Sequence, residues 1–473
     1  MQKKRRQLLY FTNNDSGRDV EMLLPLLYFA ERFLNCEVTT SLTPNIHEIF
    51  RRKPDCVVLA NTIGAKLHFD IARIATGAGI PVFALVSEGN FPTDGSFNYW
   101  GYNSAQKLYE AFLCCWSPRT RDFMQAQLPD QAEQIVLTGA PGFDRYQIYS
   151  FSTREALLEK HGIDKERFKR FIGYAGWGFG KLGHPRGRKE LRQYFKGDAG
   201  KLDWAEQQRK ALEKILEQAV VANPDTLFIF KKHPTETVAA EGNADLNEMA
   251  ALRHYPNVLY LLEENLHDII SSVDLWWVYE STTAIEADMM GKETVFIVPD
   301  DDFPRTELHE GFPEVRNYPD LQQMTEAFFS GGSLPSYEAL SGRRNEIIVN
   351  TIGWSDGLNH VRAAYYLSRT LESAPPAAKS GISWYYFLVY WILRGLTAPW
   401  FPRRLYALPF LSSKSWVLKR YSLVNLPRLR ERYRPFLESF YTRNDIPGRF
   451  RDGSLFSSVL KQSNSNLTDY GTE

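Results

Sequence analysis

Short apolar segments recur along most of the chain, and each reads as continuously apolar instead of alternating with polar residues. A strand with this pattern is buried on both faces, which is typical of a parallel sheet covered by helices on each side. Helical segments separate the apolar ones. The first series of strands is predicted at residues 7–12, 36–40, 55–61, 80–86 and 135–138.

The same pattern restarts after a charged stretch at residues 153–169. Long helices are predicted at 204–222 and 358–371. The second series of strands is predicted at residues 170–175, 226–230, 258–261, 275–278 and 294–297. The expected fold is therefore α/β, with two doubly wound Rossmann-like domains facing a cleft.

The length of 473 residues suits two or three domains. We expect an acceptor-side domain at 1–150 and a nucleotide-sugar-binding domain at 151–373. A linker rich in proline and alanine leads to a helical extension at 374–453. Residues 454–473 are polar and are predicted to form a partly disordered tail.

The C-terminal extension combines aromatic and basic residues. Its apolar helix, Trp384–Leu393, is too short to span a bilayer. Eight lysines and arginines lie between Arg394 and Arg434, against the single acid Glu431. This composition predicts an element lying in the interface of an anionic membrane leaflet. A helical appendage packed on the core, or a dimer contact, are the alternatives.

The overall composition excludes several function classes. The net charge is zero, so no nucleic-acid partner is expected. The basic N-terminus precedes a strand-like segment and lacks the apolar region of a signal peptide. The cysteines have no metal-ligand spacing and are predicted to be reduced core residues, which fits the cytosol. They are Cys36, Cys56, Cys114 and Cys115.

The predicted strand at 226–230 runs directly into a rigid, cationic segment. Lys232 and His233 follow its end, and Pro234 holds His233 in an extended conformation. Glu236 completes the segment. In an open α/β sheet, ligands bind at the carboxyl ends of the strands. These residues therefore predict an anionic ligand, most simply a nucleotide phosphate; a solvated strand end is the alternative.

A glycine-rich loop follows the first strand of the second series. Gly176, Gly178 and Gly180 allow backbone N–H groups to approach a ligand, and residues 184–188 add further cations. The spacing matches neither a Walker loop nor a dinucleotide fingerprint. The alternative is a flexible surface loop.

A third candidate segment follows the strand predicted at 275–278. Ser281, Thr282 and Thr283 open a helix, where free backbone N–H groups and hydroxyls bind phosphate. Glu286 lies within that helix and could face the nucleotide sugar. Simple N-capping by Ser281 explains the segment without any ligand.

The candidate general base lies in the first domain. Glu88 precedes Gly89 at the end of the strand predicted at 80–86, where a carboxylate can accept a proton. Chain reversal at Gly89 and Asn90 is the alternative. Rival carboxylates are Asp15, Asp19 and Asp94.

Together these segments resemble the GT-B glycosyltransferases, in particular the bacterial sialyltransferases and capsule Kdo transferases that use CMP-activated sugars. The resemblance implies that His233 and Pro234 contact the CMP phosphate, with Ser281 and Thr282 as further phosphate contacts. The sialyltransferases place two acids and a glycine at the catalytic base. Here Ser87 replaces the first acid, and only Glu88 and Gly89 match.

Two further motifs support the resemblance, which covers roughly residues 7–372. Residues 138–144, Thr-Gly-Ala-Pro-Gly-Phe-Asp, resemble a turn of capsule and teichoic-acid-type transferases. Residues 356–359, Asp-Gly-Leu-Asn, running on to Arg362, resemble their closing segment.

The resemblance implies a cytoplasmic transferase, peripheral to the inner membrane, for surface polysaccharides such as capsule or lipopolysaccharide. It would move a sugar such as Kdo or a sialic acid from a CMP donor to a lipid-linked saccharide, with no metal or other cofactor. His233 and Lys232 would hold the phosphate, and Glu88 or Asp15 would act in catalysis. The alternatives are CDP-glycerol polyol-phosphate transfer, a UDP-sugar transferase or epimerase, and a non-catalytic scaffold.

Overall fold

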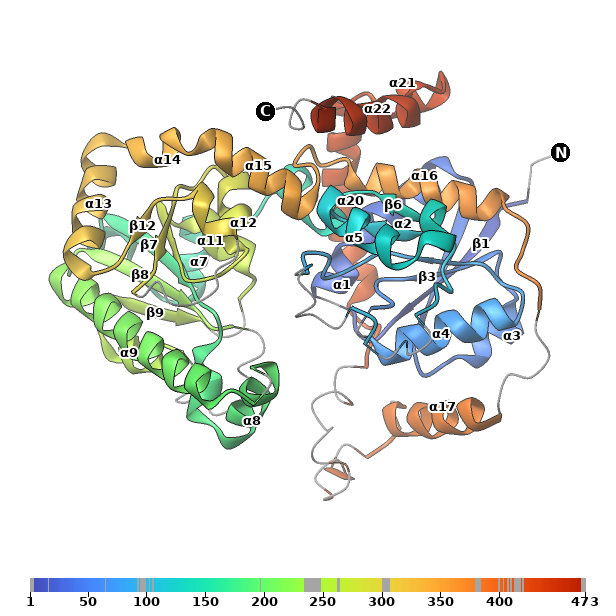
Figure 1. Cartoon of the computed structure of the whole chain (residues 1–473), viewed down its shortest axis with the longest axis horizontal. Helices are drawn as coiled ribbons and strands as arrows, with labels where there is room; N and C mark the ends of the chain where they lie inside the picture. The colour runs from blue at the N-terminus through green and yellow to red at the C-terminus, as the bar shows by residue number, and fades with distance from the viewer. Residues whose placement is uncertain are drawn as a thin grey trace. The chain divides into compact units, whose positions relative to one another are not determined.

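The computed structural model describes residues 4–468 except 16, 64, 92, 94–98, 102, 104–105, 196, 234–247, 262–263, 300–306, 379–383, 399, 403, 406–407, 409–410, 412–417 and 419–420. The chain forms two compact units. The first contains Met1–Tyr149 and Val349–Glu473, and the second contains Ser150–Ile348. Each is built on a sheet with helices on its faces (Figure 1).

The first unit contains a six-stranded parallel sheet of order β2-β1-β3-β4-β5-β6. All five strands predicted for this region are present, which confirms the parallel α/β reading. The sixth strand, β5, was not predicted. The strands are β1 (Arg6–Thr12), β2 (Cys36–Leu42), β3 (Cys56–Leu59), β4 (Val82–Ala84), β5 (Leu113–Cys115) and β6 (Ile135–Leu137).

The second unit contains a parallel sheet of order β12-β11-β10-β7-β8-β9. Its five predicted strands are also present, and among the described residues of this unit the two-residue edge strand β12 is the one strand that was not predicted. The strands are β7 (Arg170–Ala175), β8 (Thr226–Lys231), β9 (Val258–Leu261), β10 (Leu275–Val278), β11 (Thr294–Ile297) and β12 (Glu314–Val315).

Burial explains why the strands are apolar throughout. Every residue of β3, β10 and β11 is buried, as expected for strands covered on both faces. All four cysteines are buried and free. The helices of the second unit are α7 (Arg154–Lys160), α8 (Pro185–Tyr194), α9 (Ala199–Ala222), α11 (Leu266–Ser272), α12 (Thr283–Met289), α13 (Tyr318–Gly331) and α14 (Pro335–Ala339). Helix α15 (Ser341–Ile352) leads back into the first unit.

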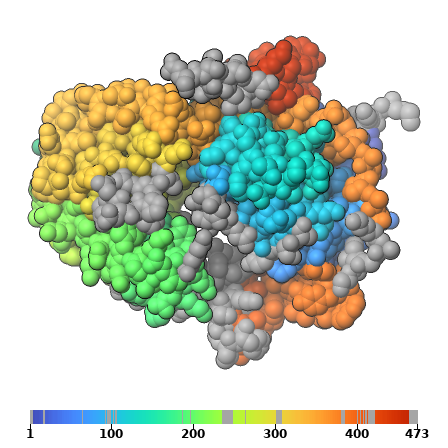
Figure 2. All heavy atoms as spheres, in the orientation of Figure 1, coloured from blue at the N-terminus to red at the C-terminus, as the bar shows by residue number. Residues whose placement is uncertain are grey.

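The first unit takes helices from both ends of the sequence. Its N-terminal helices are α1 (Arg18–Glu21), α2 (Leu24–Phe33), α3 (His47–Arg52), α4 (Lys66–Gly77), α5 (Pro118–Gln127) and α6 (Arg145–Ile148). Its C-terminal helices are α16 (Asn359–Glu372), α17 (Trp384–Thr397), α20 (Leu426–Arg443), α21 (Ile446–Arg451) and α22 (Ser454–Thr468). Helix α17 lies at the surface of this unit (Figures 1 and 2).

Two features of the C-terminal region differ from the sequence prediction. Helix α16 belongs to the first unit, where it packs on α2, although its sequence follows the second series of strands. Residues 454–468 form helix α22, in a region predicted to be a disordered tail. Leu455 and Val459 are buried, because they lie one helical turn apart on the face that packs on α16. Among the described residues, no helix is both long enough and apolar enough to cross a membrane.

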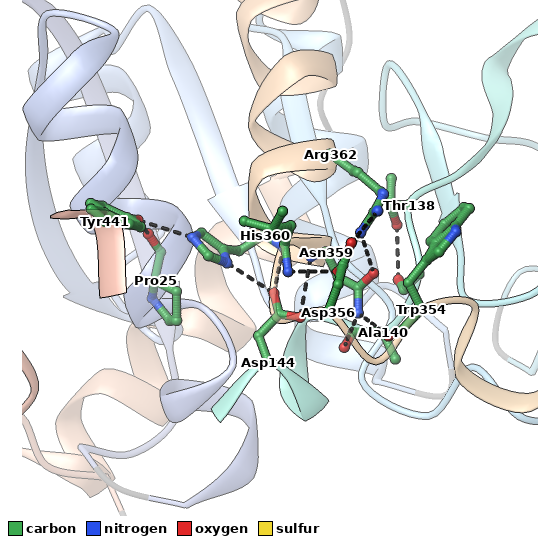
Figure 3. A network of polar contacts seen from close by, with 12 residues as sticks. Pro25, Thr138, Ala140, Asp144, Trp354, Asp356, Asn359, His360, Arg362 and Tyr441 are labelled. Atoms are coloured by element: carbon green, nitrogen blue, oxygen red, sulfur yellow. Dashed lines mark hydrogen bonds and ion pairs between the residues drawn. The ribbon is translucent and has the colours of Figure 1, made fainter. Parts of the chain in front are cut away.

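A buried polar network joins the two halves of the first unit (Figure 3). Asp144 accepts hydrogen bonds from the backbone amides of Asn359 (3.1 Å) and His360 (2.6 Å). The Nδ1 atom of His360 lies 2.9 Å from the same carboxylate, and its Nε2 atom lies 2.9 Å from the hydroxyl of Tyr441. These contacts connect the turn after β6 to helices α16 and α20.

An ion pair extends the same network. The guanidinium of Arg362 donates to Asp356 at 2.9 and 2.6 Å and stacks over the ring of Trp354. The side chain of Asn359 donates to the carbonyls of Ala140 and Trp354. The two motifs that resemble transferase segments, 138–144 and 356–362, therefore contact each other and close the first unit.

Candidate functional site

The strand order of the second sheet identifies one edge as the place for a ligand. From β7 the chain proceeds to β8 and β9 on one side, and it then returns to β10 on the other side of β7. This reversal is a topological switch point between β7 and β10. In open α/β sheets, ligands bind outside the carboxyl ends of the strands at such a point.

Strand register brings three of the predicted segments to this edge. Ala175, the last residue of β7, pairs with Lys231 in β8 and with Val278 in β10. The segments that begin at Gly176, Lys232 and Tyr279 therefore leave the sheet at the same level. Because the three segments leave the sheet at the same level, one ligand at this edge can be contacted by all three of them, as the sequence predicts.

The glycine-rich loop is shaped by a buried carboxylate, that of Glu248. Its side chain accepts hydrogen bonds from the hydroxyl of Tyr174 (2.8 Å) and the backbone amide of Gly178 (3.0 Å). The amide of Phe179 also donates to this carboxylate. Burial raises the pKa of Glu248, and these donors oppose the rise. The loop thus already directs two backbone N–H groups at a carboxyl group of the protein itself.

The predicted glycines are needed for close contacts within the loop. A Cβ atom at Gly176 would lie 1.9 Å from Oε1 of Glu248. Gly178 has φ of +88°, which favours glycine, and a Cβ atom there would lie 3.3 Å from the imidazole of His233. Packing accounts for both glycines. The amide of Gly178 points to Glu248, which differs from the expectation that it faces a phosphate.

Lys232 and His233 were predicted to form the cationic side of the site. Lys232 is only 5% exposed, and its backbone amide donates to the carbonyl of Leu261 at 3.1 Å. His233 is half-buried and lies against Gly178. The predicted contacts Pro234 and Glu236 lie outside the described residues.

The turn after β10 has an unusual backbone conformation. Glu280 has φ of +43°, although it is not glycine. Met249, next to Glu248, has φ of +58°. Such conformations cost of order 1–3 kcal/mol each and gather at functional sites. The ring of Tyr279, which precedes Glu280, lies 5.1 Å from that of Phe179. The turn after β10 and the glycine-rich loop are therefore in contact.

The residues that open α12 have different environments. Ser281 accepts a hydrogen bond from the amide of Thr283 at 3.3 Å, which is local turn chemistry. The hydroxyl of Thr283 accepts from Nε1 of Trp276 at 3.1 Å and is buried, so it holds the core of the sheet. Thr282 is exposed, and Glu286 is half-buried. Of the three hydroxyl residues, Thr282 is the most accessible to a ligand.

In the first unit, the predicted base Glu88 lies beyond the carboxyl end of β4 and is exposed. A Cβ atom at Gly89 would lie 2.3 Å from the indole of Trp116. That indole donates to the carbonyl of Val86 at 2.7 Å. Tight packing of Trp116 therefore explains the glycine, and it leaves the preceding carboxylate at the surface.

The rival carboxylate Asp15 has a role in the fold. Its side chain is buried and accepts hydrogen bonds from the amide of Asn425 (2.8 Å) and the hydroxyl of Ser422 (2.8 Å). Burial opposes ionisation, but these bonds outweigh it and lower the pKa of Asp15. Asp15 thus tethers the segment before α20. The rival Asp94 lies outside the described residues.

A buried histidine near the carboxyl edge of the first sheet could not be singled out from the sequence. Nδ1 of His68 donates to the carbonyl of Asn61 at 2.9 Å. Its Nε2 atom is buried and has no hydrogen-bond partner among the described residues. Burial lowers the pKa of His68, and the nearby charge of Asp19 opposes this. The sequence also contains no signal for Glu248, because its partner Gly178 lies 70 positions away. No group of three metal-ligating side chains occurs within the described ranges.

Comparisons with solved structures establish the fold. S. aureus MnaA, solved with UDP, has a TM-score of 0.50 and 12% identity; the match covers 80% of this chain and all of that one. A protein assigned as a UDP-N-acetylglucosamine 2-epimerase from Listeria monocytogenes has a TM-score of 0.52 and 13% identity, with the same coverage. No family model and no curated protein matches the sequence. The shared feature is a GT-B-like fold of two Rossmann-like α/β units.

Proposed function

We propose that the chain is an enzyme acting on a nucleotide sugar, and that its second unit binds the nucleotide. The observation that supports this proposal is the strand register: the segments after β8 and β10, which contain Lys232, His233 and Thr282, leave the second sheet at the same level as the loop after β7, beside the switch point. Lys232, a buried residue, provides a positive charge, and the half-buried imidazole of His233 provides a hydrogen-bond donor; both are suited to a phosphate.

A UDP-sugar is the first candidate substrate, for a transferase or an epimerase. One of the two similar structures was solved with UDP, and the other is assigned as a UDP-N-acetylglucosamine 2-epimerase. Both share the fold over 80% of this chain. A CMP-sugar transferase is the second candidate, because His233 and Pro234 resemble the His-Pro pair that contacts the CMP phosphate in that family. The lipid-linked saccharide acceptor and surface polysaccharide assembly belong to this second candidate.

The proposed residues can stabilise the charge that develops during the reaction. When the bond between the sugar and the phosphate breaks, negative charge develops on the leaving nucleotide, and Lys232 and His233 stabilise it. In a transfer reaction, Glu88 removes the proton of the acceptor hydroxyl as the new glycosidic bond forms. The exposed position of Glu88 allows solvent or substrate to reach its carboxylate.

Calorimetric titration of the wild-type protein and His233→Ala with UDP, CMP and CDP tests the site. A hydrogen bond to a charged group contributes about 1.5–3 kcal/mol, so His233→Ala should weaken binding roughly 10- to 150-fold. His254→Ala is the control, since His254 is exposed and precedes β9, at the opposite, amino-terminal edge of the same sheet. Unchanged affinity in His233→Ala rejects the site.

The preferred nucleotide distinguishes the candidates. Tightest binding of UDP supports the first, and tightest binding of CMP supports the second. Incubation with the UDP-sugar alone separates an epimerase, which alters the sugar without an acceptor, from a transferase. Failure to bind any nucleotide supports the non-catalytic scaffold instead.

A further inference from the structure

Helix α17 is apolar around its whole circumference. Its sequence, Trp-Tyr-Tyr-Phe-Leu-Val-Tyr-Trp-Ile-Leu-Arg-Gly-Leu-Thr, contains one charged residue, Arg394. A helix of this kind is normally buried on all sides. In this protein only one side of the helix is covered by the first unit, so the other side requires an explanation.

The covered side is firmly held. Tyr390 is 1% exposed and belongs to the core cluster formed with α4 and strands of the first sheet. Its hydroxyl donates to Asp70 at 3.4 Å. Tyr386 and Val389 pack on the same cluster, and the guanidinium of Arg73 lies 4.3 Å from the ring of Tyr386. Helix α17 is thus docked on the outer side of α4 (Figure 1).

The opposite side exposes large apolar side chains. Trp384 is 73% exposed and Trp391 is 70% exposed. At about 100° per residue, positions 384, 388, 391 and 392 lie opposite 386 and 390. This outer face contains Trp384, Tyr385, Leu388, Trp391 and Ile392. The orange spheres of this segment lie at the surface in the space-filling view (Figure 2).

The charge of the surrounding sequence indicates what covers this face. From Trp384 to Arg430 the sequence has eight lysines and arginines and no aspartate or glutamate. Arg394, near the end of the helix, and Arg404 beyond it are both exposed. A basic region around exposed tryptophans is complementary to the anionic headgroups and acyl boundary of a bilayer. Two copies of such a surface would repel each other.

We propose that the outer face of α17 binds the surface of an anionic lipid bilayer, with the helix lying parallel to the membrane plane. The tryptophans enter the boundary between headgroups and acyl chains, where amphipathic rings are favoured. Arg394 and Arg404 contact lipid phosphates. This interaction is independent of the nucleotide site.

Co-sedimentation of the full chain with vesicles tests the proposal. We expect binding to vesicles of phosphatidylcholine and phosphatidylglycerol, weak binding to phosphatidylcholine alone, and loss of binding at high salt. Replacing both tryptophans, Trp384→Ser with Trp391→Ser, should weaken binding roughly tenfold or more. Val221→Ser, an exposed apolar residue of the second unit, should have no effect.

The charge contribution is tested separately. Arg394→Ser should weaken binding roughly fivefold, since one basic residue near the surface contributes about a factor of this size. Arg369→Ser, an exposed arginine on α16, is the matched control. The proposal is overturned by equal binding to neutral and anionic vesicles, or by full binding of the double tryptophan variant. A dimer in sedimentation equilibrium that the same variant abolishes shows that a second copy covers the face.

Discussion

At the residue scale, the glycines of the loop after β7 make room for side chains of the protein, whereas the sequence pattern predicts that they make room for a phosphate. Gly176 and Gly178 suggest a phosphate cradle in the sequence. In the structure, Gly176 makes room for the carboxylate of Glu248, and Gly178 lies against His233. The same lack of a Cβ atom that would admit a phosphate admits a side chain from the protein.

Replacement of Gly178 by alanine should therefore weaken nucleotide binding through His233. The added Cβ atom would lie 3.3 Å from the imidazole. The alanine would also have to keep the left-handed φ of Gly178, which lowers the free energy of unfolding by roughly 1–2 kcal/mol. Gly197→Ala is a matched control, because Gly197 also has φ of +88° but has open space around it. We expect both variants to lose similar stability and only Gly178→Ala to lose affinity for the nucleotide in calorimetric titration. Equal affinities in the two variants would contradict this role.

At the element scale, contacts with distant residues determine where the C-terminal helices begin. Helix α20 has no side-chain cap of its own at Asn425. Instead, the backbone amide of Asn425 donates a hydrogen bond to the carboxylate of Asp15, which lies 410 positions earlier in the sequence. Such a tertiary cap leaves no local sequence signal, whereas local caps such as Asn317 before α13 can be recognised.

This cap makes the stability of α20 depend on pH. The folded protein lowers the pKa of Asp15, so its stabilisation is present above the unfolded value near 3.8 and is lost as pH falls through the folded value. Asp15→Asn removes the charge and should weaken the cap by about 1 kcal/mol at neutral pH. Hydrogen exchange of α20 amides should be faster in the variant at neutral pH, and the difference should shrink in acid.

Asp452→Asn is the control for this measurement. Asp452 accepts a hydrogen bond from the backbone amide of Ser454, the first residue of α22. Its substitution should therefore affect hydrogen exchange in α22 and not in α20. A difference between wild type and Asp15→Asn that persists unchanged in acid would exclude the carboxylate as the cause.

At the scale of the whole molecule, the chain forms two units, and the first unit contains both ends of the sequence. The buried contacts of Asp144 with His360, and of His360 with Tyr441, join these ends. The proposed nucleotide site lies within the second unit, Ser150–Ile348. A bound nucleotide should therefore stabilise mainly this unit.

Differential scanning calorimetry with and without UDP checks this expectation. A ligand at 100 times its dissociation constant stabilises the unit that binds it by about 2.7 kcal/mol. We expect the transition of the second unit to move to higher temperature, while that of the first unit stays in place. In His233→Ala neither transition should move. A shift of the first unit alone would place the site elsewhere.

Most of the fold could be predicted from the sequence, because parallel strands carry a local signature. Ten strands were predicted, and in the part of the chain that the structure describes, two more are present, β5 and β12, which have three and two residues. The candidate site was predicted less completely. Lys232 and His233 were predicted from their position at the end of a strand. The contact of Glu248 and the burial of His68 depend on residues far away in the sequence, so neither residue could be singled out.

The sequence by itself determined that the chain forms two parallel sheets, since continuous apolar segments must be covered on both faces. It also determined which segments leave the second sheet at its carboxyl edge. Only the tertiary structure decided that the glycine loop holds Glu248, that Asp15 caps α20, and which face of α17 remains uncovered. The physical reason is that these features depend on contacts between residues remote in the sequence, which no local pattern records.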